Sequence, residues 1–116
     1  MKFKLLIPFY LVVLCFFACV SAKSQTDSKQ TFEILTNAQC GMCKDRIEGE
    51  LNFVKGIVFA ELNVASKVLT VKFKSSKISA DDIRTKVSEI GYNADDIKAD
   101  PEAQRALPAC CQPGGH

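Results

Sequence analysis

Two cysteines, Cys40 and Cys43, carry the clearest chemical signal in this sequence of 116 residues. They flank Gly41 and Met42, at a point where an alternating apolar segment gives way to helical periodicity. At the start of a helix both sulfur atoms can point at one spot, and the free amides of the first turn and a neighbouring cation lower the pKa of a thiol. Such a pair binds a soft metal ion or forms a disulfide.

The ligand types favour particular ions. Two thiolates with no histidine or carboxylate in the loop suit a d¹⁰ ion that accepts low coordination, so Cu(I) or Hg(II) is expected, and Zn(II) or Cd(II) is less satisfied by two ligands. Lys44 and the amides of the first helical turn are expected to stabilise the thiolates by about 0.3–1 kcal/mol each. Met42 is interpreted as packing against the helix, with a weak thioether ligand as the alternative.

A second use of the same pair is a disulfide or thiol–disulfide redox catalysis. A thioredoxin-like oxidoreductase also has its cysteines at a helix start, but that fold relies on a proline facing them. This chain has no proline between Pro8 and Pro101. The sequence therefore favours a metal-binding protein, not an enzyme, with the redox protein as the alternative.

Four segments have the pattern of strands. Residues 31–36 alternate apolar and polar side chains, as a half-buried strand does, and lead into the cysteine loop. Residues 57–64 and 68–73 are apolar, β-branched runs joined closely enough for a hairpin. Residues 92–97 are the last candidate strand, although they contain poor strand formers.

Two segments have the pattern of helices. The first begins at Cys43 and is expected to end at Gly56, with apolar residues at helical spacing on one face. The second begins at Ser79, which forms a capping-box pattern with Asp82, and ends at Gly91. The order strand, helix, strand, strand, helix, strand predicts an α+β, ferredoxin-like βαββαβ open-faced sandwich, with two helices on one face of a four-stranded antiparallel sheet.

This topology predicts where one aromatic residue lies relative to the cysteines. The loop before the last strand should lie at the same end of the sheet as the cysteine loop. Tyr92 is therefore expected close to Cys40 and Cys43, either as a packing residue or with its hydroxyl beside the ligands.

The N-terminal residues 1–22 have the features of a secretory signal peptide. Lys2 and Lys4 precede an apolar run of about 16 residues, shorter than the roughly 20 of a membrane-spanning helix. A periplasmic or secreted location is expected, with no stable membrane insertion after cleavage. A retained anchor and lipid attachment at Cys19 are the alternatives.

Removal of the signal defines the remaining organisation. Residues 23–29 are polar and read as a linker, residues 30–98 as the domain and residues 99–116 as a cysteine-containing tail. The mature chain would keep 13 basic residues against 13 acidic ones. A chain with this balance offers no basic stripe to nucleic acid.

Residues 31–97 resemble the heavy-metal-associated domain, the family of the copper chaperones, the N-terminal modules of metal-exporting ATPases and the periplasmic mercury-binding protein. The resemblance rests on the cysteine motif at 40–43, on Gly56-Ile57, on the apolar spacing at 60–64 and on the turn at 90–92. It implies a carrier that binds metal through Cys40 and Cys43 and passes it to a metal-transporting membrane protein or another carrier. The sequence departs from the family at Ala38 and Gln39, where methionine and threonine are usual, and Ala38 leaves core volume to be filled.

The tail contains its own potential ligands. Residues 101–107 predict a short helix that begins with Pro101 and stops at Pro108. Cys110, Cys111 and the single histidine, His116, follow it. We expect Cys110 or Cys111 either to fold back as a third ligand or to offer a second capture site. A tail with resting disulfides is the alternative.

Overall fold

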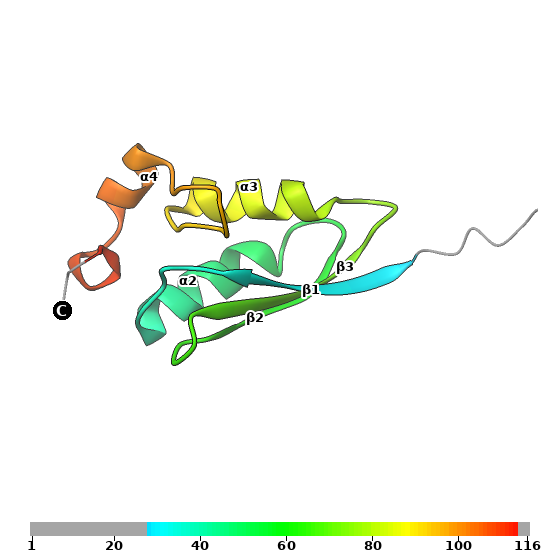
Figure 1. The fold of residues 1–116 in the computed structure, drawn as a ribbon, viewed down its shortest axis with the longest axis horizontal. Helices are drawn as coiled ribbons and strands as arrows, with labels where there is room; N and C mark the ends of the chain where they lie inside the picture. Colours follow the sequence, from blue (N-terminus) through cyan, green and yellow to red (C-terminus); the bar gives the residue numbers. More distant parts are fainter. Residues whose placement is uncertain (1–27, 114–116) are drawn as a thin grey trace, which may run out of the picture.

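Three strands form an antiparallel sheet in the computed structural model, which describes residues 28–113 (Figure 1). They are β1 (Lys29–Leu35), β2 (Ile57–Asn63) and β3 (Val68–Lys74), and their order is β1-β3-β2. The central strand β3 pairs antiparallel with both neighbours. Three of the four expected strand segments are thus present, and β2 and β3 form the expected hairpin.

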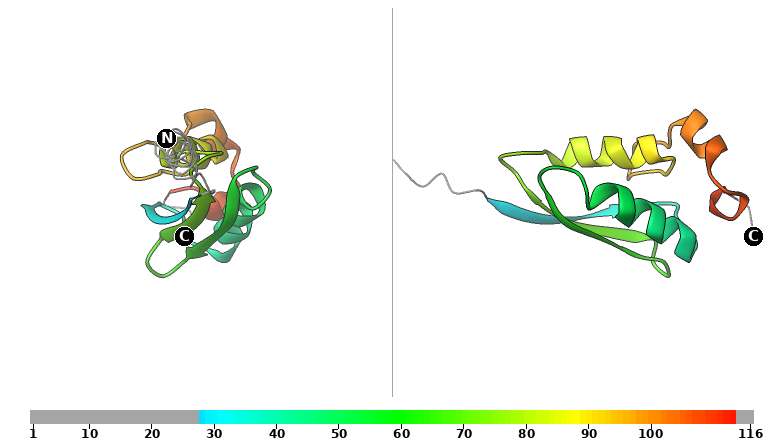
Figure 2. Two further views of the ribbon diagram at one scale, coloured as in Figure 1. Left: turned by 90° about the vertical axis from the view of Figure 1, so that its right-hand side faces the viewer. Right: turned by 180° about the vertical axis from the view of Figure 1, so that it is seen from behind.

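Two helices cover one face of this sheet (Figures 1 and 2). They are α2 (Gly41–Leu51) and α3 (Ala80–Ile90). Each turns its apolar stripe toward the sheet, because apolar residues three to four positions apart share one side of a helix. The fully buried side chains of the helices are Cys43, Ile47, Leu51, Ile83 and Val87. They meet a sheet face formed by Ile34, Ala60, Leu62, Leu69, Val71 and Phe73.

The ends of α3 follow the sequence prediction closely. The Ser79 side chain accepts a hydrogen bond from the Asp82 amide, the Asp82 carboxylate accepts one from the Ser79 amide, and Gly91 closes the helix in the left-handed conformation. The predicted end of α2 is wrong. This helix stops at Leu51, and Gly56 lies further on with φ 101°, where a Cβ would come within 2.9 Å of Ile78.

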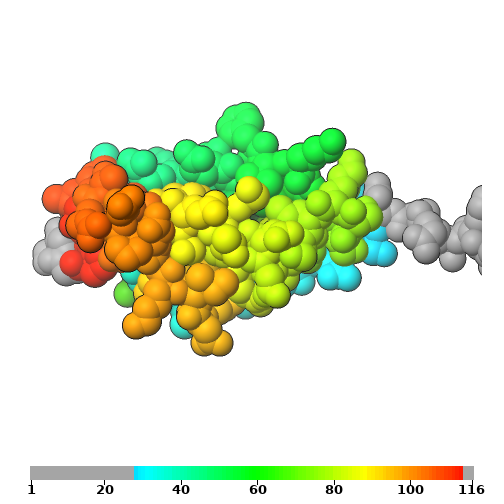
Figure 3. Space-filling model, turned by 90° about the horizontal axis from the view of Figure 1, so that it is seen from above, coloured from blue at the N-terminus to red at the C-terminus, as the bar shows by residue number. Residues whose placement is uncertain are grey.

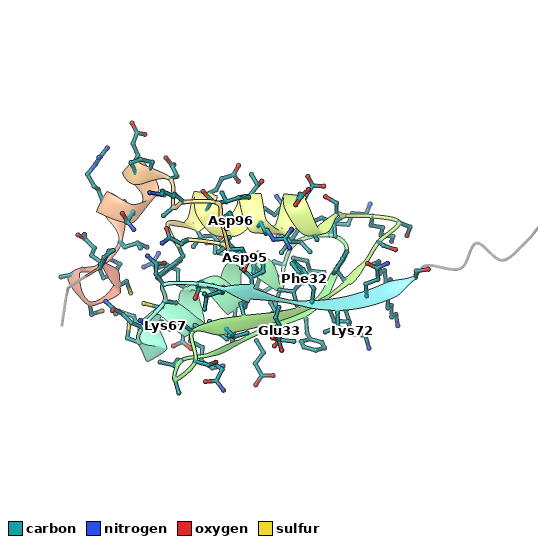
Figure 4. All side chains as sticks on the ribbon, in the orientation of Figure 1. Phe32, Glu33, Lys67, Lys72, Asp95 and Asp96 are labelled. Atoms are coloured by element: carbon teal, nitrogen blue, oxygen red, sulfur yellow. The ribbon has the colours of Figure 1, made fainter. Side chains whose placement is uncertain are left out.

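The predicted fourth strand at 92–97 is also wrong. Ala94 and Ile97 pair with each other in an isolated bridge, so the segment closes on itself. Asp95 takes the left-handed φ of 52°, which interrupts extended backbone. Its amide donates to the Leu35 carbonyl and its carboxylate accepts from the Leu35 amide, and Asp95 lies between α3 and β1 (Figure 4). These two hydrogen bonds of Asp95 stand in place of the backbone hydrogen bonds that a fourth strand would make with β1.

The tail folds against one end of the body. Helix α4 (Pro101–Ala106) is followed by a 3₁₀ turn, η2 (Ala109–Cys111). In the space-filling view the tail covers the end of α3 (Figure 3). The helix predicted at 101–107 is confirmed, one residue shorter than expected.

The signal peptide predicted at 1–22, most of the linker at 23–29 and His116 lie outside the described residues. β1 begins at Lys29, one residue before the predicted domain boundary. Within residues 28–113 no helix has the length and apolar character required to cross a bilayer.

Candidate metal centre

Cys40 and Cys43 lie at the start of α2, where their Sγ atoms are 3.0 Å apart. Cys40 is the N-cap residue, with φ −148° and ψ 166°, and Cys43 falls in the first turn. One turn of helix therefore brings the two side chains to the same point. Both thiols are free; Cys43 is fully buried and Cys40 is half-buried.

Polar side chains fix the loop that carries Cys40. Thr36 donates to the Lys67 carbonyl through both its amide and its hydroxyl, and the same hydroxyl accepts a hydrogen bond from the Ala38 amide. The Asn37 side chain accepts from the Asn93 amide at 2.9 Å, which ties the cysteine loop to the segment after α3. Hydrogen bonds therefore hold the short loop between β1 and α2, which carries Cys40, in a defined conformation.

The two thiols of the pair differ in acidity. Burial raises the pKa of the Cys43 thiol, but interactions with Cys40, Tyr92 and the neighbouring backbone outweigh burial and lower that pKa to about 7. The hydrogen bond with Cys43 raises the pKa of Cys40. Cys43 is therefore the thiol that ionises first, and a thiolate is the form that binds metal.

The tail brings two more sulfur atoms to the pair. The Sγ atom of Cys111 lies 3.8 Å from that of Cys40 and 3.9 Å from that of Cys110. The Sγ atoms of Cys40, Cys110 and Cys111 all lie within 4.8 Å of one another. Burial raises the pKa of Cys111 to about 12, so its thiol keeps its proton unless a cation displaces it. The structure thus places all four cysteines of residues 28–113 at one end of the molecule.

The tail is held in this position by backbone and side-chain contacts. Gln39 donates from its side-chain amide to the Gln112 carbonyl at 2.9 Å, and Gln112 donates in turn to the Leu107 carbonyl at 2.9 Å. Leu107 and Cys111 are buried in the common core. Sequence reasoning treated Gln39 only as a departure from the family pattern, and no sequence signal marks it as a clamp for a segment 73 positions away.

Tyr92 is buried beside these thiols, as predicted. Burial, followed by interactions with Cys43 and Cys111, raises the pKa of its hydroxyl. The Tyr92 hydroxyl is also the one buried side-chain oxygen or nitrogen within residues 28–113 that lacks a hydrogen-bond partner. Ala38, Leu107 and Cys111 are all buried in the one core of the domain, so the tail contributes side chains to that core.

Two residues beside the motif make contacts that the sequence did not predict. The Lys44 ammonium donates to Glu48 at 2.6 Å and to the Leu62 carbonyl at 2.8 Å, which commits this cation to α2 and β2 and not to the thiolates. Met42 is about half exposed, and its sulfur accepts from the Cys110 thiol at 3.2 Å. Its packing partner is therefore the tail, a contact that sequence reasoning did not anticipate.

This fold and this site define a class: a small α+β domain with a pair of free thiols at the start of the first helix after β1. A family model for the heavy-metal-associated domain matches residues 34–93. The chain belongs to the heavy-metal-associated domain family, as its sequence motif predicts.

Two proteins of similar sequence are named as copper proteins. The copper chaperone CopZ of Staphylococcus aureus (strain bovine RF122 / ET3-1) is 30% identical over 54 residues, which cover 47% of this chain and 79% of CopZ. The copper-exporting P-type ATPase of Bacillus subtilis (strain 168) is 30% identical over 67 residues, which cover 58% of this chain but only 8% of the ATPase. The chain thus corresponds to one small part of that transporter.

A solved structure shows the same fold. Oxidized MerP from Ralstonia metallidurans CH34 superposes with a TM-score of 0.55 at 18% identity, covering 58% of this chain and 94% of MerP. These alignments cover about half of this chain, between 47% and 58% of its residues.

Proposed function

We propose that this protein is an exported carrier of a soft d¹⁰ cation, Cu(I) or Hg(II), that Cys40 and Cys43 capture. The observation that carries the proposal is the pair of free thiols 3.0 Å apart at the start of α2, within a heavy-metal-associated domain. The donors gathered around Cys40 are sulfur atoms, which such soft ions prefer. The names of the copper chaperone and copper-exporting ATPase relatives support Cu(I) as the cargo.

The proposed partner is a metal-transporting membrane protein or another metal carrier. Cys40 is half-buried and is the N-cap residue of α2, so it is the more accessible thiol of the pair for an incoming cysteine. A thiolate of the partner bonds to the ion as a bond from Cys40 or Cys43 breaks, and the ion keeps its oxidation state. The proton lost by the incoming thiol is balanced by one taken up by the departing cysteine.

Export is proposed from residues 1–22, which combine a basic start, an apolar run and small residues at the end. A periplasmic or extracellular carrier meets an oxidising environment, so its thiols must be reduced before they bind metal. Fractionation of cells that produce the full chain, with mass determination of the product, tests the location and the cleavage.

One experiment separates the metal carrier from the thiol–disulfide enzyme. The reduced protein is titrated with Cu(I) against a competing chelator and with Hg(II), while insulin reduction is assayed in parallel. We expect tight binding that is lost in Cys40→Ser and Cys43→Ser and kept in Cys110→Ser, which removes a thiol from the rim of the site. Rapid insulin reduction together with feeble metal binding would instead assign the pair to redox catalysis.

A further inference from the structure

We propose that Cys111, from the C-terminal tail, is a third ligand to the ion held by Cys40 and Cys43. The inference rests on the proposed function and specifies its ligand set: three thiolates in a trigonal site closed by the chain's own tail. Cys110, its neighbour in sequence, remains at the rim.

The spacing of the sulfur atoms supports three ligands. With a metal–sulfur bond of about 2.3 Å, as found for zinc, sulfur atoms lie about 4.0 Å apart in a trigonal site and about 4.6 Å apart in a linear one. The separation of 3.8 Å between Cys40 and Cys111 already matches the trigonal value. Cys43 lies 3.0 Å from Cys40 and must move by about 1 Å to admit an ion with such bonds. A trigonal site requires less of this movement than a linear one.

The tail delivers Cys111 in a fixed position. Its side chain is 2% exposed, and Leu107, also buried, anchors the preceding residues. The Gln39 side chain donates to the carbonyl of Gln112, the residue after Cys111. Because these contacts order the tail in the folded protein, binding an ion does not bear the cost of immobilising it.

The unpaired hydroxyl of Tyr92 is an independent indication. A buried hydroxyl without a partner is destabilising, because the group has given up its hydrogen bonds to water. Its polar neighbours are the thiols of Cys43 and Cys111, which become strong acceptors when an ion replaces their protons. The hydroxyl is therefore placed to donate to a ligand sulfur of the ion-bound site, because its neighbours are the two cysteines that we assign with Cys40.

Cys110 is the less suitable ligand. It is half-buried, and its thiol donates to the sulfur of exposed Met42 at 3.2 Å. Its Sγ is within 4.8 Å of Cys40, so a more exposed site of Cys40, Cys110 and Cys111 is the geometric competitor. Burial favours the inner set, since Cys43 and Cys111 are nearly inaccessible to water and Tyr92, also buried, interacts with both.

A third internal ligand changes how the ion leaves. The thiolate of a partner forms its bond to the ion as the bond to Cys111 breaks, with no change in oxidation state, and Cys111 takes up a proton in place of the one that the incoming thiol loses. The tail then acts as a displaceable cap, which retains the ion until a competing thiol arrives.

X-ray absorption of the reduced, full-length mature protein, loaded with one equivalent of Hg(II) or Cu(I), counts the sulfur ligands. We expect three in the wild type, two in Cys111→Ser and three in Cys110→Ser, the matched control one residue away. The affinity should fall more than about 10-fold in Cys111→Ser, since even losing a group that only supports a ligand costs 10–100-fold. Tyr92→Phe, a positioning variant, should keep three sulfurs and bind more weakly.

Each other result overturns the assignment. Two sulfurs in the wild type remove the third ligand whatever the variants do, and three sulfurs in Cys111→Ser or two in Cys110→Ser move the role to Cys110. These outcomes leave the proposed function standing as long as Cys40→Ser and Cys43→Ser lose binding. Unchanged binding in those two variants would instead sink the proposed function itself.

Discussion

The two main helices have the same length, 11 residues, but their ends are built differently. Helix α3 begins with a reciprocal hydrogen-bonded box between Ser79 and Asp82 and carries Asp81 and Asp82 in its first turn. The N-cap residue of helix α2 is Cys40, whose side chain makes no capping hydrogen bond, and the first turn of α2 contains no acidic residue. One helix start is completed for stability, and the other is left open.

The open start has a physical use. The first amides of a helix carry partial positive charge and attract anions. In α3 the carboxylates of Asp81 and Asp82 already compensate this partial positive charge. In α2 it remains available to a thiolate or to the negatively charged complex of two or three thiolates with a monovalent cation. Under the proposed function, thiolate and metal binding take the place of capping at α2. Mutation at the start of α2 should therefore change metal affinity, and mutation at the start of α3 should change stability.

The largest effect is expected on metal affinity at α2. Structural zinc sites with four ligands bind with about 10–16 kcal/mol, or roughly 3 kcal/mol for each ligand, so Cys40→Ser and Cys43→Ser should each weaken Cu(I) binding by more than about 100-fold. Competition with a chelator of known affinity measures this. Ser79→Ala, at the start of α3, should leave the metal affinity unchanged. A comparable loss of affinity in Ser79→Ala would contradict the assignment of metal binding to the start of α2 alone.

The next largest effect concerns the end of α3, on which the tail packs. Gly91 has φ 119°, and a Cβ there would lie 3.1 Å from Ala103 backbone atoms and from Leu107. Gly91→Ala should lower the free energy of unfolding by about 1–3 kcal/mol and loosen the tail. Chemical denaturation measures the first effect and proteolysis of the tail the second.

Gly49 offers the matched control, because a Cβ there meets nothing within 4 Å. Gly49→Ala lies inside α2 and should raise stability by roughly 0.5–1 kcal/mol. If both glycine variants behaved alike, the close packing of the tail on Gly91 would be wrong.

A smaller effect separates the two caps directly. Ser79→Ala removes a cap hydrogen bond and should cost about 1 kcal/mol of unfolding free energy. Cys40→Ala removes no cap and should cost less than about 0.5 kcal/mol. Urea denaturation of the metal-free, reduced proteins makes the comparison, and an equal loss in Cys40→Ala would mean that Cys40 stabilises the helix after all.

The smallest effect is expected at Lys44. Its ammonium binds Glu48 and the Leu62 carbonyl on the solvent side of α2, where water and salt screen the ion pair, so Lys44→Met should leave the midpoint of urea unfolding nearly unchanged. The metal affinity of the Lys44→Met variant should equal that of the wild type within the error of the competition assay. A loss above about two-fold would restore the role beside the thiolates that the sequence suggested for Lys44.

Most of the fold could be predicted from the sequence because its signals are local. Alternating apolar residues located β1 and the β2–β3 hairpin, and Ser79 with Asp82 located the start of α3. The segment at 92–97 was mispredicted because Asp95 satisfies the end of β1 with its side chain, a long-range contact that periodicity does not record.

The site was predictable to different degrees. The spacing of Cys40 and Cys43 identified the pair, and topology placed Tyr92 beside it. The tail cysteines were named as candidates, but their position depends on the Gln39 clamp and on Leu107 packing, which join residues far apart in sequence. The partners of Lys44 could not be read from its position next to Cys43, because Glu48 and β2 hold its side chain in the folded protein.

Nuclear magnetic resonance of the reduced, ¹⁵N-labelled protein during titration with Cu(I) compares the two helix starts in one measurement. Cu(I) is diamagnetic, so the amide signals remain observable as the ion binds. We expect the amides of residues 39–44 to shift and to saturate at one ion per chain, while those of residues 79–82 stay in place. Saturable binding that leaves residues 39–44 unmoved would contradict the account.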